Sequence, residues 1–461
     1  MAGDIAIETE VQPWDRLHEL AERDDPASLS EYIRALDRSD AMRAILRLDP
    51  THRYKVFTAL NAEEAAELIE EFPDEQAAEI VESLPPEMAA TILGEMWSDE
   101  AADVIGDLEQ EDADAILKEM APAEAAEARE LAGYDDETAG GLMITEFLSF
   151  DENTTVGEVA DSLQARGEEL EDYFSRYAYG VSSRGRLVGV IEVRDLVLTP
   201  RGTLISDSMI PARFITADAD LDAVRAFFDA NDFAAVPVVD RHGRLMGVVR
   251  RTALREALAE RAEREMLRMQ GIVGGDEIRT LPLLTRTRRR LSWLSINIVL
   301  NVLSASVIAI YLDTLNAVIA LAVFLPIISD MSGCSGNQAV AVSMRELALG
   351  IVKPFEVMRV WLKEISVGVL NGIALGILLG IVAWLWKGSP WLGVIVGAAL
   401  TLNTLIAVTI GGTVPLILKR FHIDPAVASG PILTTVTDIC GFFIVLNLAA
   451  LMLAHLPSGS I

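Results

Sequence analysis

The chain has 461 residues, and its 69 Asp and Glu outnumber its 38 Lys and Arg, which gives a formal net charge of −31. The whole excess lies in residues 1–290, with 62 acidic and 31 basic residues, because residues 291–461 hold seven of each. An acidic surface repels nucleic acid and attracts cations. Nucleic acid is therefore excluded as a partner, although the same charge would also suit a plain solubility surface.

The start of the chain, the cysteines and the histidines narrow the class further. MAGDIAIETEVQPWDRLHEL is acidic and lacks the apolar core of a secretory signal. Cys334 and Cys440 form neither a CxxC zinc motif nor a disulfide framework. The five histidines are scattered, and no nucleophile–base motif accompanies them. We therefore expect the acidic half to be cytoplasmic and the protein not to be an enzyme.

A twelve-residue repeat runs through residues 65–132. Segments such as AAELIEEF, AAEIVESL and AADVIGDL begin at residues 65, 77 and 101, and each predicts a helix of about two turns. One such helix cannot bury its apolar face alone, so the units are expected to stack into a small superhelix. The simpler interpretation of the repeat is a scaffold whose acidic face is only solvated.

Residues 140–258 contain a longer duplication. GRLVGVIEVRDL at 185–196 recurs as GRLMGVVRRTAL at 243–254, and each copy follows a helical stretch and a short apolar strand. This order predicts two βαββα units. The pair resembles a tandem CBS module, a fold that commonly regulates the protein attached to it. Such modules often bind adenine nucleotides, although this sequence has no Gly-rich phosphate loop.

The stretch 253–272 joins this module to the apolar half of the chain. It has no Pro or Gly before Gly271 and carries a broken apolar stripe, which predicts a continuous helix. A rigid helix at this position would transmit movement between the two halves. A plain linker is the alternative.

The apolar half contains five stretches long enough to cross a bilayer, since a spanning helix needs about 20 apolar residues. They lie at 291–312, 315–343, 361–386, 391–418 and 426–454. Basic residues before the first span and in the 344–363 connection place those segments inside. The amino end is therefore expected inside and the carboxyl end outside. Four glycines at four-residue spacing in the third span favour close helix packing: Gly368, Gly372, Gly376 and Gly380.

One carboxylate, Asp438, stands near the middle of the fifth span, in LTTVTDICGFF at 433–443. A charge at the bilayer centre costs about 2.5–3.5 kcal/mol on insertion scales, so it needs a polar interior or a water path. The second span is polar too, because LPIISDMSGCSGNQ at 325–338 contains Asp330 and several hydroxyl and amide groups. We expect this segment to expose backbone carbonyls, which requires a cavity at membrane depth. The structural alternative is an Asp held by neighbouring hydroxyls.

The two polar segments predict an oxygen-lined pathway for a cation. Oxygen ligands suit Mg²⁺, Ca²⁺ or Mn²⁺ better than they suit thiolate-preferring metals. Because Mg²⁺ keeps several of its waters, one carboxylate per chain fits capture of a hydrated ion better than a closed cage. A proton relay through Asp438 fits less well, because no second titratable chain continues across the membrane.

The order of helical repeat, CBS pair, linking helix and five spans, with GNQ in the second span and TDICG in the fifth, resembles the MgtE family of Mg²⁺ transporters and channels over essentially the whole chain. The resemblance implies a multidomain membrane protein with an all-α superhelical amino-terminal domain, an α+β tandem CBS domain and an α-helical five-span domain. The implied boundaries are 1–137 for the helical repeat, 138–258 for the CBS pair, 259–285 for the linking (plug) helix and 286–461 for the pore domain. It also implies a homodimer in the inner cell membrane, in contact with lipid, with its pore between subunits.

The resemblance assigns two sets of Mg²⁺ ligands. Asp438 matches the pore carboxylate of the family, and the remaining pore positions are Gly336, Asn337, Gln338 and the added carboxylate Asp330. The cytoplasmic sensor positions are Glu67, Asp99, Asp103, Gly140, Asp220, Asp222, Asp232, Glu256 and Glu265.

The sequence departs from the family pattern at both sites. Ala253, Arg261 and Arg264 replace acids in the linking stretch, which predicts fewer or weaker sensor sites, and Cys334 stands where Asn is common. The predicted function is a Mg²⁺ channel-like transporter that imports the ion down the membrane potential and closes when Mg²⁺ bridges its acidic domains. The alternatives are a broader transporter or exporter of Co²⁺, Mn²⁺ or Ni²⁺, a transporter regulated by a nucleotide at the CBS pair, and a nucleotide sensor that the spans only anchor.

Overall fold

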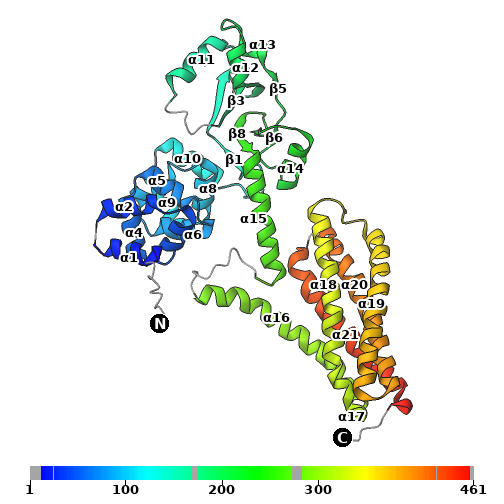
Figure 1. The fold of residues 1–461 in the computed structure, drawn as a ribbon. Coiled ribbons are helices and arrows are strands. Elements are labelled where there is room, and N and C mark those ends of the chain that lie inside the picture. The colour runs from blue at the N-terminus through cyan, green and yellow to red at the C-terminus, as the bar shows by residue number, and fades with distance from the viewer. Residues whose placement is uncertain (1–11, 24, 168–173, 273–282, 422, 457–461) are drawn as a thin grey trace, which may run out of the picture. The chain divides into compact units, whose positions relative to one another are not determined.

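The computed structural model describes residues 12–23, 25–167, 174–272, 283–421 and 423–456 (Figure 1). The chain forms two compact units, residues 1–261 and residues 262–461. The first unit holds short helices and two sheets, and the second holds the long helices.

The first unit begins with a stack of short helices. They are α1 (Pro13–Arg23), α2 (Pro26–Ala35), α3 (Arg38–Ile45), α4 (Pro50–Ala59), α5 (Ala62–Ile69), α6 (Asp74–Glu82), α7 (Pro86–Leu93), α8 (Ser98–Asp107), α9 (Gln110–Glu119) and α10 (Pro122–Leu131). The predicted stack of short helices is confirmed. From α2 onward the helices start twelve residues apart, so the period begins at residue 26, well before the sequence repeat. Asx side chains rather than an Ala pair mark these earlier units, because Asp25, Asp37, Asp49 and Asn61 cap α2 to α5.

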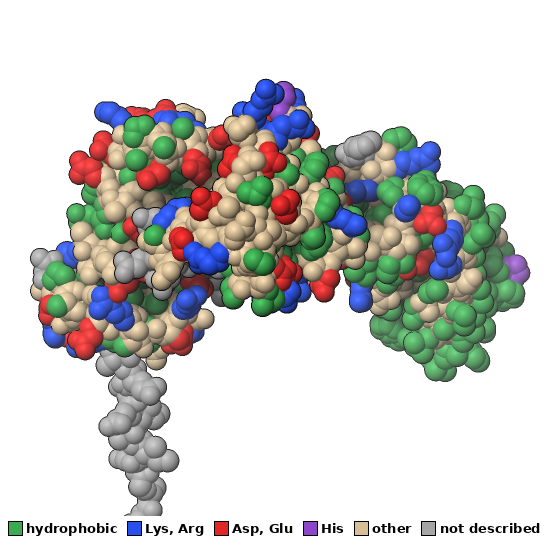
Figure 2. Space-filling view, turned by 90° about the horizontal axis from the view of Figure 1, so that it is seen from above, with side chains coloured by type: hydrophobic (Ala, Val, Ile, Leu, Met, Phe, Trp, Pro, Cys, Tyr) green, Lys and Arg blue, Asp and Glu red, His purple; other side chains and the backbone are tan. Residues whose placement is uncertain are grey.

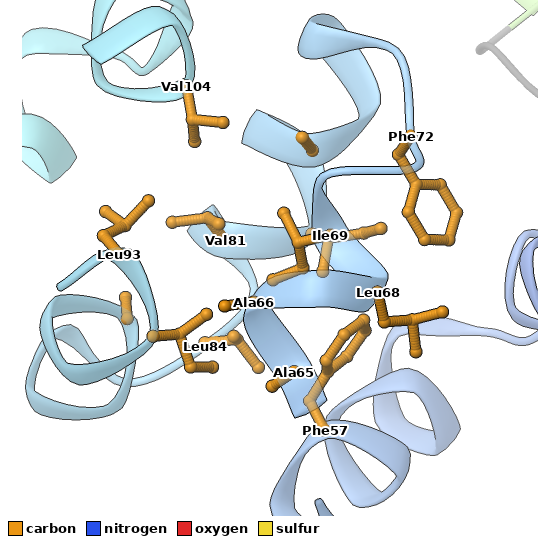
Figure 3. Packing of buried hydrophobic residues seen from close by; sticks show 14 of the residues in the cluster. Phe57, Ala65, Ala66, Leu68, Ile69, Phe72, Val81, Leu84, Leu93 and Val104 are labelled. Carbon is orange, nitrogen blue, oxygen red and sulfur yellow. The ribbon is translucent and has the colours of Figure 1, made fainter. Parts of the chain in front are cut away.

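The stacked helices share one apolar core. Figure 3 shows Phe57 of α4, Ile69 of α5 and Leu93 of α7 directed into the same interior, and each is at most 1% exposed. Burying an apolar side chain of this size stabilises the fold by about 1.5–3 kcal/mol. Each short helix therefore depends on its neighbours for stability.

Two four-stranded sheets follow the helical stack. One has the order β2 (Phe147–Asp151), β3 (Phe174–Val181), β4 (Leu187–Glu192) and β5 (Ile210–Pro211). The other has the order β1 (Met143–Ile144), β8 (Leu245–Arg250), β7 (Ala235–Val239) and β6 (Ile215–Thr216). The helices of this module are α11 (Val156–Ala165), α12 (Val193–Leu198), α13 (Ile205–Ser208), α14 (Leu221–Ala230) and α15 (Arg251–Met269). The two predicted βαββα copies are present, and β1 interlocks them because it precedes the first copy and pairs with β8 of the second.

The predicted linking helix corresponds to α15, which is continuous from Arg251 to Met269. Gly271 follows it with a left-handed φ of 80°, a conformation that favours glycine and ends the helix. Residues 273–282 of the predicted 259–285 segment lie outside the described residues.

Among the described residues of the second unit, five helices are long and apolar enough to cross a membrane, as predicted. They are α16 (Leu283–Ile310), α18 (Leu325–Ala348), α19 (Val357–Lys387), α20 (Pro390–Arg420) and α21 (Pro425–Leu451). Short elements join or follow them: α17 (Leu312–Ala317), η1 (Ile319–Val323) and η2 (Leu453–His455). Hydrophobic side chains cover the surface of this unit, whereas acidic and basic side chains are dispersed over the soluble part (Figure 2).

The glycines of the third span lie in a tight helix contact. A Cβ on Gly372 would lie 2.7 Å from the carbonyl oxygen of Thr401, and one on Gly380 would lie 2.9 Å from that of Gly393. Such distances leave room for hydrogen only. The packing of α19 against α20 therefore depends on these glycines, as their spacing predicts.

The expectation that residues 325–338 expose backbone carbonyls is wrong. These residues belong to the continuous helix α18, which begins at Leu325. Pro326 stands in the first turn, where its missing N–H is not needed. The polar groups that this segment offers are therefore side chains.

Candidate functional site

A cavity of about 630 Å³ lies among α16, α17, α18 and α21. Polar residues of α18 and α21 occur in its wall at spacings of three, four and seven, which places them on one face of each helix. They are Ser329, Asp330 and Asn337 from α18 and Thr434, Thr437 and Asp438 from α21. The structure thus brings together three of the predicted pore residues from segments about 100 positions apart.

Asp438 is half-buried in this wall and accepts a hydrogen bond from the Ser329 hydroxyl. The adjacent turn is held from α20, where the buried Asn403 amide donates to the Thr437 carbonyl across 3.1 Å. Sequence reasoning missed Ser329 and Asn403. The available signal was that each is a polar residue inside an apolar stretch.

The cavity is large enough for a hydrated dication. Six waters and their ion need on the order of 200 Å³, at about 30 Å³ per water. The cavity of about 630 Å³ exceeds this volume. The polar groups in its otherwise apolar wall are carboxylates, hydroxyls, one amide and the thiol of Cys334. The oxygen groups among them suit hard cations.

Two predicted pore residues lie elsewhere. Gly336 is buried in the helix packing, where a Cβ would lie 2.8 Å from Leu433 and 3.0 Å from the carbonyl oxygen of Ala407. Gln338 is exposed and does not line the cavity. A ligand role for either residue stays a prediction.

In the first unit, carboxylates gather around α8. The acidic cluster consists of Glu70, Asp74, Asp99, Glu100, Asp103, Asp136 and Glu260, whose charges act on one another. Burial, followed by repulsion from Asp99 and Asp74, raises the pKa of Glu100 to about 8. Burial, followed by repulsion from Asp136 and Asp74, raises the pKa of Asp103 to about 9. These two groups hold protons at neutral pH that a bound cation would displace.

The acidic cluster already contains one cation of the protein itself. Arg250, the last residue of β8, donates a hydrogen bond of 2.9 Å to Asp99, whose side chain is 8% exposed. The guanidinium also lies 4.5 Å from the ring centroid of Trp97. Burial raises the pKa of Asp99 even though Arg250 lowers it. The ion pair ties the helical stack to the second CBS copy.

The other predicted sensor residues are dispersed. Asp220 caps α14 by accepting from the Ala223 N–H at 2.8 Å, and Asp222 lies 3.7 Å from Arg261. Asp232 lies 4.0 Å from Arg251. Glu67 is exposed but lies at the edge of the acidic cluster, because its charge acts on Glu70. The rest are not brought into the cluster: Glu256 is exposed, Gly140 donates its N–H to the Ala217 carbonyl, and Glu265 belongs to the second unit.

Sequence reasoning missed five members of the acidic cluster. Glu100 is next to Asp99 on α8, whereas Glu70, Asp74, Asp136 and Glu260 come from other parts of the chain, and only the fold brings them to Asp99 and Asp103. The available signal was the spacing of the acids on α8. Asp99 and Asp103 are four residues apart and so lie on one face of the helix, with Glu100 beside them.

Comparison with known families matches three successive parts of the chain. The MgtE intracellular N domain matches residues 21–137, the CBS domain matches 139–200 and 205–260, and the MgtE divalent cation transporter matches 325–448. With its membrane-capable helices, the chain is thus a multi-pass membrane transporter whose amino-terminal domains are cytoplasmic.

Curated relatives identify the family. The chain is 32% identical to the magnesium transporter MgtE of Thermus thermophilus, over 95% of this chain and 98% of that protein. It is 33% identical to the magnesium transporter MgtE of Enterococcus faecalis, over 72% of this chain and 73% of that protein. The chain therefore belongs to the MgtE family of magnesium transporters, whose function is transport rather than catalysis.

Solved structures resemble the soluble half. The crystal structure of the cytosolic domain of the Mg²⁺ channel MgtE in complex with ATP is 32% identical, covers 52% of this chain and 98% of its own, and has a TM-score of 0.47. The soluble part of a magnesium transporter is 28% identical over 54% of this chain and 98% of its own, with the same TM-score of 0.47.

Proposed function

We propose that this chain imports Mg²⁺ and that the ion passes Asp438. The observation that carries the proposal is the convergence of Asp330, Asn337 and Asp438 on one cavity of about 630 Å³. A helix that only anchored a sensor would need none of these polar groups, because each is costly in the membrane.

The cavity is suited to a hydrated ion. Mg²⁺ prefers six oxygen ligands and gives up its waters reluctantly, so it would keep most of its shell beside the single carboxylate of Asp438. The hydroxyl of Ser329 and the amide of Asn337 would then hydrogen-bond to the ion's waters.

The driving force would be the membrane potential. An elementary charge gains about 2.3 kcal/mol per 100 mV, so a dication gains about 4.6 kcal/mol when the inside is negative. Import therefore requires no nucleotide hydrolysis. A tenfold inward or outward concentration ratio is worth only about 1.4 kcal/mol, so the potential dominates the direction.

Asp330 can test the alternative that the protein transports a broader range of divalent cations. This exposed carboxylate lines the cavity beside Ser329. We expect Asp330→Ser to shift the preference among Mg²⁺, Mn²⁺ and Co²⁺ by roughly threefold to tenfold, because a second carboxylate favours ions that dehydrate more readily than Mg²⁺. Uptake of Mg²⁺ into vesicles with each competitor measures this. Asp313→Asn, at an exposed position in α17 that does not line the cavity, is the control. An unchanged ranking would assign Asp330 a structural role.

The acidic cluster is proposed as a gate sensor. Without a divalent cation, protons on Glu100 and Asp103 relieve part of the repulsion among its carboxylates, and the repulsion that remains opposes the contact of the helical stack with the CBS pair and α15. Mg²⁺ would bridge these groups and favour one arrangement of the cytoplasmic half, which α15 would pass to the spans. Arg250 performs part of this neutralisation through its contact with Asp99, so sensing is expected to need a higher Mg²⁺ concentration than an all-acidic cluster would.

The raised pKa values of the acidic cluster give a pH dependence. Glu100 titrates at about 8 and Asp103 at about 9, above the ordinary range of unfolded carboxyls, so the folded state holds more protons than the unfolded state. Stability of the Mg²⁺-free state should then fall as pH rises from about 5 to 9.

Because Mg²⁺ displaces those protons, the protection that it adds to α8 should be larger at pH 8.5 than at pH 6.5. Amide hydrogen exchange of α8 measures this, with NaCl at equal ionic strength as the control. Equal protection at both pH values would contradict cation binding at these groups.

Several features of the assembly also stay proposals. We expect a homodimer in contact with membrane lipid, as the resemblance to the MgtE family implies. The carboxyl end is expected outside, as the basic connections predict. Binding of an adenine nucleotide by the CBS pair is the second route of regulation, and it would be detected by titrating ATP with and without Mg²⁺.

A further inference from the structure

Two histidines that are 34 positions apart in the sequence meet on the helical stack. His18 of α1 and His52 of α4 have ring centroids 4.5 Å apart, and their planes are tilted by 32°. Glu22 follows His18 one turn later, with its Oε1 3.8 Å from the His18 Nδ1. The ligand atoms of His18, Glu22 and His52 all lie within 4.8 Å of one another. We call these three residues the histidine site.

A fourth residue orients one of the two imidazoles. Asp49 Oδ2 lies 2.5 Å from the Nδ1 of His52, and its Oδ1 caps α4 by accepting from the N–H groups of Thr51 and His52. A carboxylate on Nδ1 fixes the proton there and leaves a lone pair on Nε2. This arrangement of carboxylate, imidazole and free nitrogen is the one that metal-binding histidines use.

The helices that carry the histidine site are firmly packed. Leu17 and Ala21, which flank His18 on α1, are fully buried, as are Val56 and Phe57 on α4. The Lys55 ammonium also donates to the Ala21 carbonyl across 3.1 Å, so the two helices are joined beside the site. The site itself is open, because 45% of the His18 side chain and 63% of the Glu22 side chain are exposed.

We propose that the histidine site binds a transition-metal dication of the Zn²⁺, Co²⁺ or Ni²⁺ type. Two imidazoles and one carboxylate make up three ligands, and water completes the fourth position of a tetrahedral ion. Ligand atoms about 2.0–2.1 Å from such an ion lie roughly 3.4 Å apart, so the exposed side chains need to close by little more than 1 Å. Imidazole ligands select these metals and leave Mg²⁺ to oxygen sites.

The histidine site is separate from the Mg²⁺ sites proposed above. The match to the MgtE intracellular N domain begins at residue 21, which leaves His18 outside it. An ion held between α1 and α4 fixes the first helix onto the stack. A transporter of divalent ions thereby acquires a site that distinguishes a competing transition metal from Mg²⁺.

Titration of the full chain in detergent with Co²⁺ tests the proposal. Co²⁺ has visible absorption whose intensity rises in tetrahedral coordination, and the titration is run with millimolar Mg²⁺ present throughout. We expect wild type to bind one more Co²⁺ per chain than His18→Gln or His52→Gln. The control is His242→Gln, which removes an exposed histidine of the CBS pair and should bind as wild type does.

Asp49→Asn separates metal binding from helix structure. Asn is as good a cap as Asp, so α4 is retained, whereas the loss of the carboxylate should weaken Co²⁺ binding by about 10–100-fold. Circular dichroism checks the fold of each variant. If His52→Gln is misfolded, the result with His18→Gln decides the outcome, because the His18 side chain is partly exposed and its replacement should leave the fold intact. The same Co²⁺ stoichiometry and spectrum in wild type and folded His18→Gln would overturn the proposal, as would displacement of the Co²⁺ by Mg²⁺.

Discussion

Asp438→Asn is expected to reduce Mg²⁺ uptake by at least about a hundredfold while the protein keeps its fold. The loss follows from electrostatics, since two unit charges 4 Å apart have an interaction energy of about 4 kcal/mol at an effective dielectric constant of 20. About 1.4 kcal/mol corresponds to a tenfold change in the affinity for the ion. The fold should be retained because an Asn carbonyl oxygen can still accept the hydrogen bond from Ser329. Uptake into vesicles, normalised to folded protein, is the measurement.

Ser329→Ala supplies the graded control for this prediction. It removes the hydroxyl that donates to Asp438 and leaves the carboxylate in place. Because the charge of Asp438 remains and water in the cavity can donate in place of the lost hydroxyl, its effect on uptake should be much smaller than that of Asp438→Asn. Wild-type uptake by a folded Asp438→Asn protein would refute the assignment of this residue to the ion path.

Arg250→Gln is expected to destabilise the first unit by about 3 kcal/mol in the absence of Mg²⁺. The substitution leaves Asp99 buried without its cation, and breaking a buried ion pair from one side costs about 3–5 kcal/mol. It also removes the guanidinium that competes with a bound ion. We therefore expect Mg²⁺ to restore more protection to α8 in this variant than in wild type, measured by hydrogen exchange.

Arg244→Gln is the matched control for this second prediction. Arg244 pairs with Asp240 at 2.7 Å, but 61% of its side chain is exposed, and exposed ion pairs are worth about 0–1 kcal/mol. Removing it should change neither stability nor the response to Mg²⁺ by a comparable amount. If Arg250→Gln behaves like Arg244→Gln, the ion pair with Asp99 does not hold the helical stack to the CBS pair.

The sequence predicts most of the fold because its periodic signals are strong. The twelve-residue period, the duplicated strand motif and the apolar stretches each specify one kind of element, and all three are present in the structure. The earliest helices were not predicted as part of the repeat, because their starts are marked by the N-caps Asp25, Asp37 and Asp49 rather than by an Ala pair. The predicted exposure of backbone carbonyls at 325–338 was wrong because a polar composition is compatible with a continuous helix, and Pro326 stands in the first turn of α18.

The sites were harder to predict because they depend on contacts between distant segments. The lone charge of Asp438 is visible in the sequence, but its partner Ser329 is 109 positions away. Likewise, the contact of Arg250 with Asp99 spans 151 positions. His18 and His52 looked scattered for the same reason. Spacing along one helix can be derived from sequence, whereas the meeting of two helices requires the fold.

Potential-driven import is tested most directly by Mg²⁺ entry into vesicles that contain only the wild-type protein, with an imposed potential and no nucleotide. An inside-negative potential should accelerate entry, and reversing the potential should suppress it, because a dication gains about 4.6 kcal/mol per 100 mV. Entry that is indifferent to the sign of the potential, or absent from a folded protein, would contradict a potential-driven Mg²⁺ path through the Asp438 cavity.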